Sequence, residues 1–397
     1  MRRKRIGILT GGGDVPGLNS VIKSVAWRGN EKGWDVIGIR RGFEGLTHVD
    51  LDDAQSKARY IVELTRENTR TIDRTGGTIL HSTRVGPSKV RHVPEHLRDK
   101  PLKATEGKGG ITFDLTEQVL ENLERLGIDA LITIGGDGTL KSAAELSRRG
   151  VNVIGIPKTM DNDVQNTEYC IGFSTAITRA TAAIDRQRTT IGSHERIGIF
   201  RIFGRDAGFT ALYTAHATSN RCVIPEYKVD LDKLLALLLE EKKENPSNYV
   251  LVILSEGAAW HGYTPQEYGR PDPFGRRKKV SVAQVLSEEI LHRLNEDTIV
   301  SDLTYDLRSG DPDFIDKLVA ATFGTMALDA IFEGASGLMS AVVNGCYQLV
   351  PLPDPSLGAR KVDVKTMYNT DRYRPLYGNK RGMPIFLNQV RPPVHHS

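Results

Sequence analysis

The chain has 397 residues, of which 39% are hydrophobic and 26% are charged, a composition typical of soluble globular proteins and sufficient for two or three domains. The formal net charge is only +4 and the basic residues are spread along the chain, so we expect no nucleic-acid partner, although small anionic substrates are compatible. No apolar run approaches the about 18 residues of a membrane span, and we expect no membrane partner. Three scattered cysteines without metal-ligand spacing favour a reducing compartment. We therefore expect a cytoplasmic protein.

Short apolar runs alternate along the chain with loops rich in Gly, Asp and Thr and with helix-like stretches. The expected strands, in chain order, are residues 6–10, 131–134, 151–156, 197–203 and 249–254. Helices are expected after three of the loops, at about 18–28, 139–149 and 209–216. This alternation indicates an α/β fold with parallel sheets covered on both faces. In such sheets ligands bind beyond the carboxyl ends of the strands, where these loops lie.

Two regions interrupt the alternation. Residues 86–112 contain three prolines and a Gly-Lys-Gly-Gly run, and we interpret them as an insertion or mobile loop. After Pro351 the chain is rich in Pro, Arg and Tyr with little periodicity. We expect an extended C-terminal segment that packs on the body of the protein or on a neighbouring subunit.

The first loop, residues 10–17, reads Thr-Gly-Gly-Gly-Asp-Val-Pro-Gly. Consecutive glycines let backbone N–H groups approach an anion, and the N-terminus of the following helix adds a favourable dipole. No Gly-Lys-Ser/Thr follows, so the loop is not a Walker A sequence. A phosphate site and a simple tight turn between strand and helix both fit this loop taken alone.

The second loop, residues 135–139, reads Gly-Gly-Asp-Gly-Thr. Its carboxylate, Asp137, can reach a Mg²⁺ ion carried by a polyphosphate; the alternative is a cap of the next helix. The pattern is moderately specific for phosphoryl transfer and does not define one substrate.

The third loop, residues 157–163, reads Pro-Lys-Thr-Met-Asp-Asn-Asp. Two carboxylates two residues apart are costly to place together without a positive ligand or metal. One can accept a proton from an attacking hydroxyl while the other orients it or helps to hold a metal site. A plain surface turn is the alternative. Because consecutive strands are commonly neighbours, we expect this loop beside residues 135–139.

The order of the motifs resembles the phosphofructokinase family. The segments that carry the resemblance are residues 10–19, 76–80 with Arg84, 135–139, 157–163, 171–176, Arg196 with 203–205, and 224–226. Each motif is weak or moderate alone, but the set in this order is very specific, and it extends from about residue 5 to about residue 350.

This resemblance implies two doubly wound, mostly parallel sheets in Rossmann-like halves, with the active site in the cleft between them. Residues 1–157 would form the donor half with the inserted loop, residues 158–350 the sugar half, with parts of the chain crossing, and residues 351–397 a C-terminal extension. The family phosphorylates the 1-hydroxyl of fructose 6-phosphate in a Mg²⁺-dependent reaction. We expect a homodimer or homotetramer whose active sites are shared between subunits.

The resemblance also implies a role for individual residues. Asp161 would be the general base, with Lys158, Thr159 and Asp163 around it, and Asp137 would bind Mg²⁺ through the donor phosphates. The donor would be held by Gly12, Gly13, Arg84, Gly136, Gly138 and Thr139. The sugar phosphate would be bound by Thr159, Asp161, Phe203, Gly204, Arg205, Glu226, Tyr305 and Arg308, and by Arg196 of a neighbouring subunit. Arg84 and Arg205 would offset charge on the transferring phosphoryl group.

The chain departs from the family pattern in one sugar-binding segment. Many bacterial members have a histidine where this chain has Tyr305, and Ile299 stands where a second arginine for the 6-phosphate is expected. A tyrosine can still donate a hydrogen bond. Arg276, Arg277 or Lys278 are candidates for the missing charge.

The phosphoryl donor is ambiguous between ATP and diphosphate. Diphosphate-using members typically carry Asp where this chain has Gly138, and Lys where it has Lys158. An Asp at the first position would crowd and repel the α-phosphate of a nucleotide, so Gly138 favours ATP, and we choose ATP with diphosphate as the alternative. A non-catalytic sugar-phosphate or nucleotide-binding regulator is the alternative from another class, which loss of Asp137 or Asp161 would favour; both residues are present.

Overall fold

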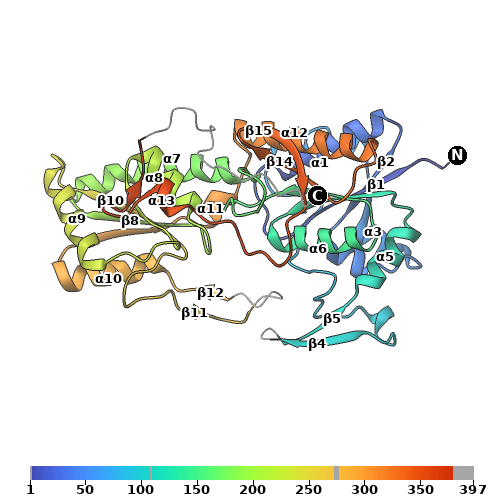
Figure 1. Ribbon diagram of the computed structural model, residues 1–397, viewed down its shortest axis with the longest axis horizontal. Coiled ribbons are helices and arrows are strands. Elements are labelled where there is room, and N and C mark those ends of the chain that lie inside the picture. Colours follow the sequence, from blue (N-terminus) through green and yellow to red (C-terminus); the bar gives the residue numbers. More distant parts are fainter. Residues whose placement is uncertain (1, 108–109, 272–276, 379–397) are drawn as a thin grey trace.

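The chain folds into two α/β halves that lie side by side (Figure 1). The structure is a computed structural model that describes residues 2–107, 110–271 and 277–378. Each half contains a mostly parallel sheet with helices on its faces. The predicted α/β fold with two doubly wound sheets is confirmed.

The first sheet has seven strands in the order β15-β14-β7-β6-β1-β2-β3. These strands are β1 (Arg5–Thr10), β2 (Asp35–Ile39), β3 (Ile61–Leu64), β6 (Ala130–Gly135), β7 (Val153–Pro157), β14 (Leu338–Val343) and β15 (Cys346–Pro351). The inner strands pair in parallel, whereas the edge strands β3 and β15 run antiparallel to their neighbours. As predicted, β6 and β7 are direct neighbours, so the loops that follow them leave the same edge of the sheet.

Alternate side chains of the strands feed two apolar cores, one on each face of the first sheet. Ile6 and Ile8 of β1 pack in the core that contains α1 (Leu18–Glu31) and α12 (Phe314–Phe332). Leu9 packs in the core that contains α5 (Thr116–Arg125) and α6 (Asp137–Arg148). This period of two is that of a strand buried on both faces, and Figure 1 shows the two helix pairs on opposite sides of the sheet.

The second sheet has four strands, all parallel, in the order β13-β8-β10-β9. Its strands are β8 (Ile197–Ile202), β9 (Arg221–Val223), β10 (Val250–Ser255) and β13 (Thr298–Asp302). The helices of this half are α7 (Phe173–Ser193), α8 (Phe209–Thr218), α9 (Leu231–Glu244) and α10 (Val282–Leu294). None of the helices in the described ranges combines the length and the apolar character that a bilayer span requires.

The chain crosses between the halves more than once. Strands β14 and β15 follow the second sheet in the sequence but complete the first, which they reach through α12. The chain then returns to the second half, where it forms α13 (Val364–Met367), β16 (Tyr368–Asn369) and β17 (Arg374–Pro375). The Tyr368 hydroxyl donates to the Cys222 carbonyl oxygen at 2.7 Å, so the C-terminal segment up to Gly378 packs on its own chain. Residues 379–397 of the expected extension lie outside the described residues.

Two hairpins project on one side of the molecule (Figure 1). Part of the expected insertion forms the first hairpin, made of β4 (Lys103–Gly107) and β5 (Gly110–Asp114). Residues 108–109 between these strands lie outside the described residues. The second hairpin consists of β11 (Glu267–Tyr268) and β12 (Lys278–Lys279). Both terminal nitrogens of the Arg91 guanidinium donate to the Pro271 carbonyl oxygen, each at 3.2 Å. The insertion therefore contacts the second half. The remaining short elements are α2 (Phe43–His48), α3 (Ala54–Tyr60), α4 (Arg66–Thr69), the 3-10 turns η1 (Ile72–Arg74) and η2 (Glu95–Leu97), and α11 (Tyr305–Arg308).

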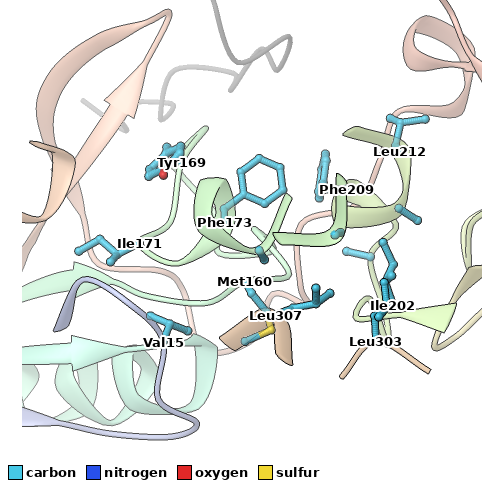
Figure 2. Close-up of a cluster of buried hydrophobic side chains, with 14 of the residues drawn as sticks. Val15, Met160, Tyr169, Ile171, Phe173, Ile202, Phe209, Leu212, Leu303 and Leu307 are labelled. Carbon is cyan, nitrogen blue, oxygen red and sulfur yellow. The ribbon is translucent and has the colours of Figure 1, made fainter. Parts of the chain in front are cut away.

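An apolar cluster continues from one half into the other (Figure 2). Met160 of the third loop and Leu307 of α11 lie between Val15 of the first loop and the second-half side chains Ile202 and Phe209. All five side chains are at most 4% exposed. Because these apolar side chains are almost fully buried, they fix the loops that carry the polar residues against the packed core.

Candidate active site

The first, second and third loops leave adjacent strands of the first sheet and converge. They follow β1, β6 and β7, which are neighbours in the sheet. The Gly11 amide donates to the Ile134 carbonyl oxygen at 2.9 Å, and the Lys158 amide donates to the Gly135 carbonyl oxygen at 3.0 Å. Backbone hydrogen bonds therefore tie the second loop to both of its neighbours.

Close packing and backbone conformation explain three glycines of the first two loops. A Cβ atom on Gly11 would lie 2.5 Å from the Thr139 hydroxyl, and one on Gly135 would also overlap the Thr139 side chain. Gly12 has φ of +82°, a region that glycine adopts at little cost. Its amide donates to the Thr83 carbonyl oxygen at 2.9 Å, which brings the adjacent residue, Arg84, to the first loop.

Basic groups gather at the first loop. The buried Lys158 ammonium donates to the Gly13 carbonyl oxygen at 2.5 Å, and the Arg308 guanidinium donates from Nε to the Asp14 carbonyl oxygen at 3.0 Å. Desolvation, followed by repulsion from Arg308 and Arg84, lowers the pKa of Lys158 to about 7. Positive charges this close together are stabilised when an anionic phosphate binds among them.

The third loop presents Asp161 toward the junction of the halves. Burial raises the pKa of its carboxyl above the ordinary aspartate range, and the neighbouring Asp163 and then Glu256 raise that pKa further. The residue is partly exposed, and its backbone N–H donates to the Thr159 hydroxyl at 3.2 Å. A carboxylate with a raised pKa is a better proton acceptor than an ordinary one.

Residues of the second half face the third loop from the ends of β8 and β10. Arg205, which follows β8, donates to a Glu256 carboxylate oxygen at 3.2 Å. Gly204 has φ of +122°, and a Cβ atom there would lie 2.6 Å from the Ala207 carbonyl oxygen. The Arg308 guanidinium lies 5.6 Å from the centre of the Phe203 ring. Arg308 therefore contacts both halves, because its Nε also bonds Asp14.

Glu226 follows β9 and is held by two backbone amides. Its Oε1 atom accepts from the amides of Gly208 and Val362, each at 2.9 Å. Its Oε2 atom is buried and has no partner within the described ranges. Burial raises the pKa of this carboxyl. An unpartnered buried oxygen at a strand end is suited to accept a hydrogen bond from a ligand hydroxyl.

A magnesium site would depend on Asp137, the first residue of α6. Within the described ranges no group of three or more His, Cys, Asp or Glu side chains is arranged to hold a metal. The Asp137 carboxylate also pairs with Lys141 at 3.0 Å. Mg²⁺ is usually held by one or two carboxylates together with substrate phosphates and water. The residues present therefore fit a Mg²⁺ ion that arrives with a phosphate ligand.

One of the predicted residues lies apart from the others. Arg196 precedes β8, at the opposite end of that strand from Arg205, and pairs with Asp297 at 3.0 Å. Tyr305, in α11, is 70% exposed. Gly136 and Gly138 lie at the start of α6 beside Asp137. The Arg277 side chain makes no described contact in the site, but its backbone carbonyl oxygen accepts a hydrogen bond from Arg205 at 2.5 Å. Arg276 lies outside the described residues.

Sequence reasoning did not identify two acidic residues near Asp161 as part of the site. Glu256 and Asp206 both raise the pKa of Asp161. Each follows a strand of the second sheet, and a carboxylate after a parallel strand is a signal that could have found them. Asp206 directly follows Arg205, to which the resemblance gives a role, whereas the resemblance gives none to residues 255–258.

The fold and the site together define a class of protein: a two-sheet α/β protein whose glycine-rich loops, basic groups and carboxylates suit a phosphorylated ligand. The sequence profile of a family described as phosphofructokinase matches residues 5–331. The chain belongs to the phosphofructokinase family.

Individual relatives carry two different descriptions. The chain is 37% identical over 353 residues to an "ATP-dependent 6-phosphofructokinase 3" from Streptomyces coelicolor, with 88% of this chain and 94% of that protein covered. It is 35% identical over 355 residues to a "pyrophosphate–fructose 6-phosphate 1-phosphotransferase" from Dictyoglomus thermophilum, with 89% and 92% covered. A solved structure of a pyrophosphate-dependent phosphofructokinase from Nitrosospira multiformis shares the fold, with a TM-score of 0.73, 17% identity, and coverage of 98% of this chain and 93% of that one.

Proposed function

We propose that this protein transfers the terminal phosphoryl group of ATP to the 1-hydroxyl of fructose 6-phosphate, giving fructose 1,6-bisphosphate. The observation that carries the proposal is the position of Asp161. This carboxyl has a raised pKa and lies in the loop whose Lys158 contacts the glycine-rich first loop. The segment from Lys158 to Asp161 thereby carries a proton acceptor and also contacts the proposed phosphate-binding loop. The proposal is further supported by relatives of this description that cover most of the chain.

In the proposed reaction Asp161 accepts the proton of the sugar 1-hydroxyl while the oxygen forms a bond to the terminal phosphorus. The bond between that phosphorus and the bridging oxygen breaks, and ADP leaves. Arg84, Arg205 and Lys158 offset the negative charge of the transferring group, and phosphoryl transfer depends chiefly on such positioning and charge compensation. Glu226 orients the sugar through its unpartnered Oε2 atom.

Asp137 would hold Mg²⁺ together with the donor phosphates. The ion, when bound, neutralises charge on the phosphates. The surrounding glycines leave the backbone of the first and second loops open to close approach of the donor.

Diphosphate is the second candidate donor, and Lys158 is the observation that favours it. This lysine is 3% exposed and bonds the first loop, and the resemblance places lysine at this position in diphosphate users. We give more weight to Gly138, where the aspartate of diphosphate users is missing. A purely regulatory binding protein is less favoured, since both Asp137 and Asp161 are retained.

A coupled assay of the purified protein tests this proposal directly. Fructose 6-phosphate and Mg²⁺ are supplied with either ATP or diphosphate, and formation of fructose 1,6-bisphosphate is followed. We expect a higher kcat/KM with ATP. Absence of product with both donors, in a protein that binds fructose 6-phosphate, would instead support the regulatory alternative.

We propose that Arg196 binds the 6-phosphate in the active site of a neighbouring subunit, as the family resemblance implies. Its place at the opposite end of β8 from Arg205 of its own chain is compatible with this role. We expect Arg196→Ala to raise the KM for fructose 6-phosphate on the order of tenfold or more, since a charge-assisted contact is lost. Mixed oligomers of Arg196→Ala and Asp161→Asn subunits should regain activity, because some sites then combine both wild-type residues. Each variant assembled alone is the control. No recovery in verified mixed oligomers would show that Arg196 does not act across an interface.

A further inference from the structure

The chain between β15 and α13, residues 352–363 (the crossing segment), bonds to both halves of the molecule. Lys141 of α6 donates to the Leu357 carbonyl oxygen at 3.0 Å, and Gln165 donates to the Gly358 carbonyl oxygen at 2.9 Å. Figure 1 shows this segment running from the first half to the second. It lies beyond residues 5–331, the range that the family profile matches.

Arg360 of the crossing segment holds the main chain of the third loop. Its backbone amide donates to the Asp163 carbonyl oxygen at 2.7 Å, and its Nη2 atom donates to the Asn162 carbonyl oxygen at 2.5 Å. The guanidinium carbon lies 4.3 Å from the centre of the Phe209 ring. The planar group is therefore fixed by stacking on α8 while its edge bonds the loop.

The turn that Arg360 holds has an uncommon backbone conformation. Asn162 has φ of 53°, a left-handed conformation that is unfavourable for residues other than glycine, although asparagine tolerates it best. The Asn162 side chain accepts from the Cys170 amide at 2.8 Å and donates to the Glu168 carbonyl oxygen at 2.8 Å. Such a conformation persists only when the surroundings hold it. The turn that it forms carries a carboxylate on either side, Asp161 and Asp163.

The crossing segment reaches the sugar half of the site as well. Two residues after Arg360, the Val362 amide donates to Glu226 Oε1 at 2.9 Å. One short piece of chain is thus bonded to the proposed base loop and to a proposed sugar-binding carboxylate.

We propose that Arg360 is a positioning residue for phosphoryl transfer: it holds the 161–163 turn in the conformation in which Asp161 faces the sugar hydroxyl. The Arg360 side chain acts through the carbonyl oxygen of Asn162, whereas the bond to the Asp163 carbonyl oxygen comes from the backbone amide of residue 360; the guanidinium contacts no reacting atom. The role rests on the proposed function, in which Asp161 accepts the proton. A displacement of the base by about 1 Å is sufficient to slow such a step about a hundredfold.

Steady-state kinetics of Arg360→Ala and Arg360→Lys test this role in the full-length protein. We expect Arg360→Ala to lower kcat about 10- to 100-fold, with the KM for fructose 6-phosphate changed less than about threefold. Arg360→Lys should recover part of the loss, since an ammonium still donates to a carbonyl oxygen, and added guanidinium ion at millimolar concentration should partly rescue Arg360→Ala. Arg374→Ala is the matched control, because Arg374 belongs to the same C-terminal region but pairs with Glu241 at 2.9 Å; its kcat should stay within about twofold of wild type.

Amide hydrogen exchange provides a readout that does not depend on the reaction. The peptide containing residues 159–164 should exchange faster in Arg360→Ala than in wild type or Arg374→Ala. If Arg360→Ala keeps the wild-type kcat, the proposal is overturned whatever the exchange rate of this peptide. The proposal is also overturned if Arg374→Ala loses as much kcat as Arg360→Ala. If Arg360→Ala does not fold, Arg360→Gln, which keeps a donor without the charge, carries the same comparison. Should the wild type phosphorylate no sugar, the proposed function fails, and unchanged exchange would still overturn the positioning role.

Discussion

Asp161→Asn is expected to lower kcat by at least about 10²-fold, with little change in the affinity for fructose 6-phosphate. The amide is nearly isosteric with the carboxylate but cannot accept the proton of the 1-hydroxyl, and a positioned general base typically contributes 10²–10⁴-fold. Because the interaction is made in the transition state, kcat and kcat/KM should fall together. Steady-state kinetics with saturating Mg²⁺ provide the measurement. An asparagine variant that keeps more than half of the wild-type turnover would exclude this role.

The pH dependence of the wild type offers an independent check of the same residue. Burial and the neighbouring carboxylates raise the pKa of Asp161, and the base acts only when it is deprotonated. The kcat/KM of the wild type should therefore fall as the pH is lowered through this raised pKa, at a higher pH than an ordinary aspartate would give. The residual activity of Asp161→Asn should lack this acid limb.

Gly138→Asp is expected to change the preferred phosphoryl donor. A carboxylate in the first turn of α6 would crowd and repel the α-phosphate of ATP, whereas diphosphate has no phosphate bearing a nucleoside. We expect the ratio of kcat/KM for ATP to that for diphosphate to shift about 10²-fold toward diphosphate, equivalent to about 2.7 kcal/mol. Lys158 is already buried beside the first loop, and we expect it to support the use of diphosphate in this variant.

Gly138→Asn is the matched control for charge. It adds a side chain of nearly the same size without the negative charge, so it should lose some ATP activity through crowding but gain less preference for diphosphate. If the ratio of kcat/KM for ATP to that for diphosphate shifts equally in the two variants, the effect is due to crowding and not to charge. A wild type that uses diphosphate and ignores ATP would contradict the donor assignment and would make Lys158 the better guide.

The convergence of the first three loops could be predicted from the sequence because the residue types in these loops indicate their role. Glycines between a strand and a helix, and carboxylates after successive strands, indicate both where the chain turns and which edge of the sheet it leaves. The pairing of β6 with β7 follows from the same reasoning and is confirmed.

Arg360 and strand β14 could not be predicted in this way. Arg360 bonds backbone carbonyl oxygens, which every residue carries, so no partner residue type signals the contact. The apolar run of β14 has no feature that assigns it to the first sheet, since burial requires only an apolar strand of suitable length. From the sequence, residues 158–350 are expected to form the sugar half, with parts of the chain crossing between the halves. In the structure, β14 and β15 pair within the first sheet.

The late arrival of β14 has a consequence for biosynthesis. Ile154 of β7 pairs with Leu338 of β14, and the entire second sheet is encoded between them. While the ribosome makes that intervening stretch, β7 is an uncovered edge whose amide and carbonyl groups can recruit a strand from another nascent chain. We expect molecular chaperones to matter most in this interval, and release of chains truncated before residue 338 should yield aggregates rather than a stable donor half.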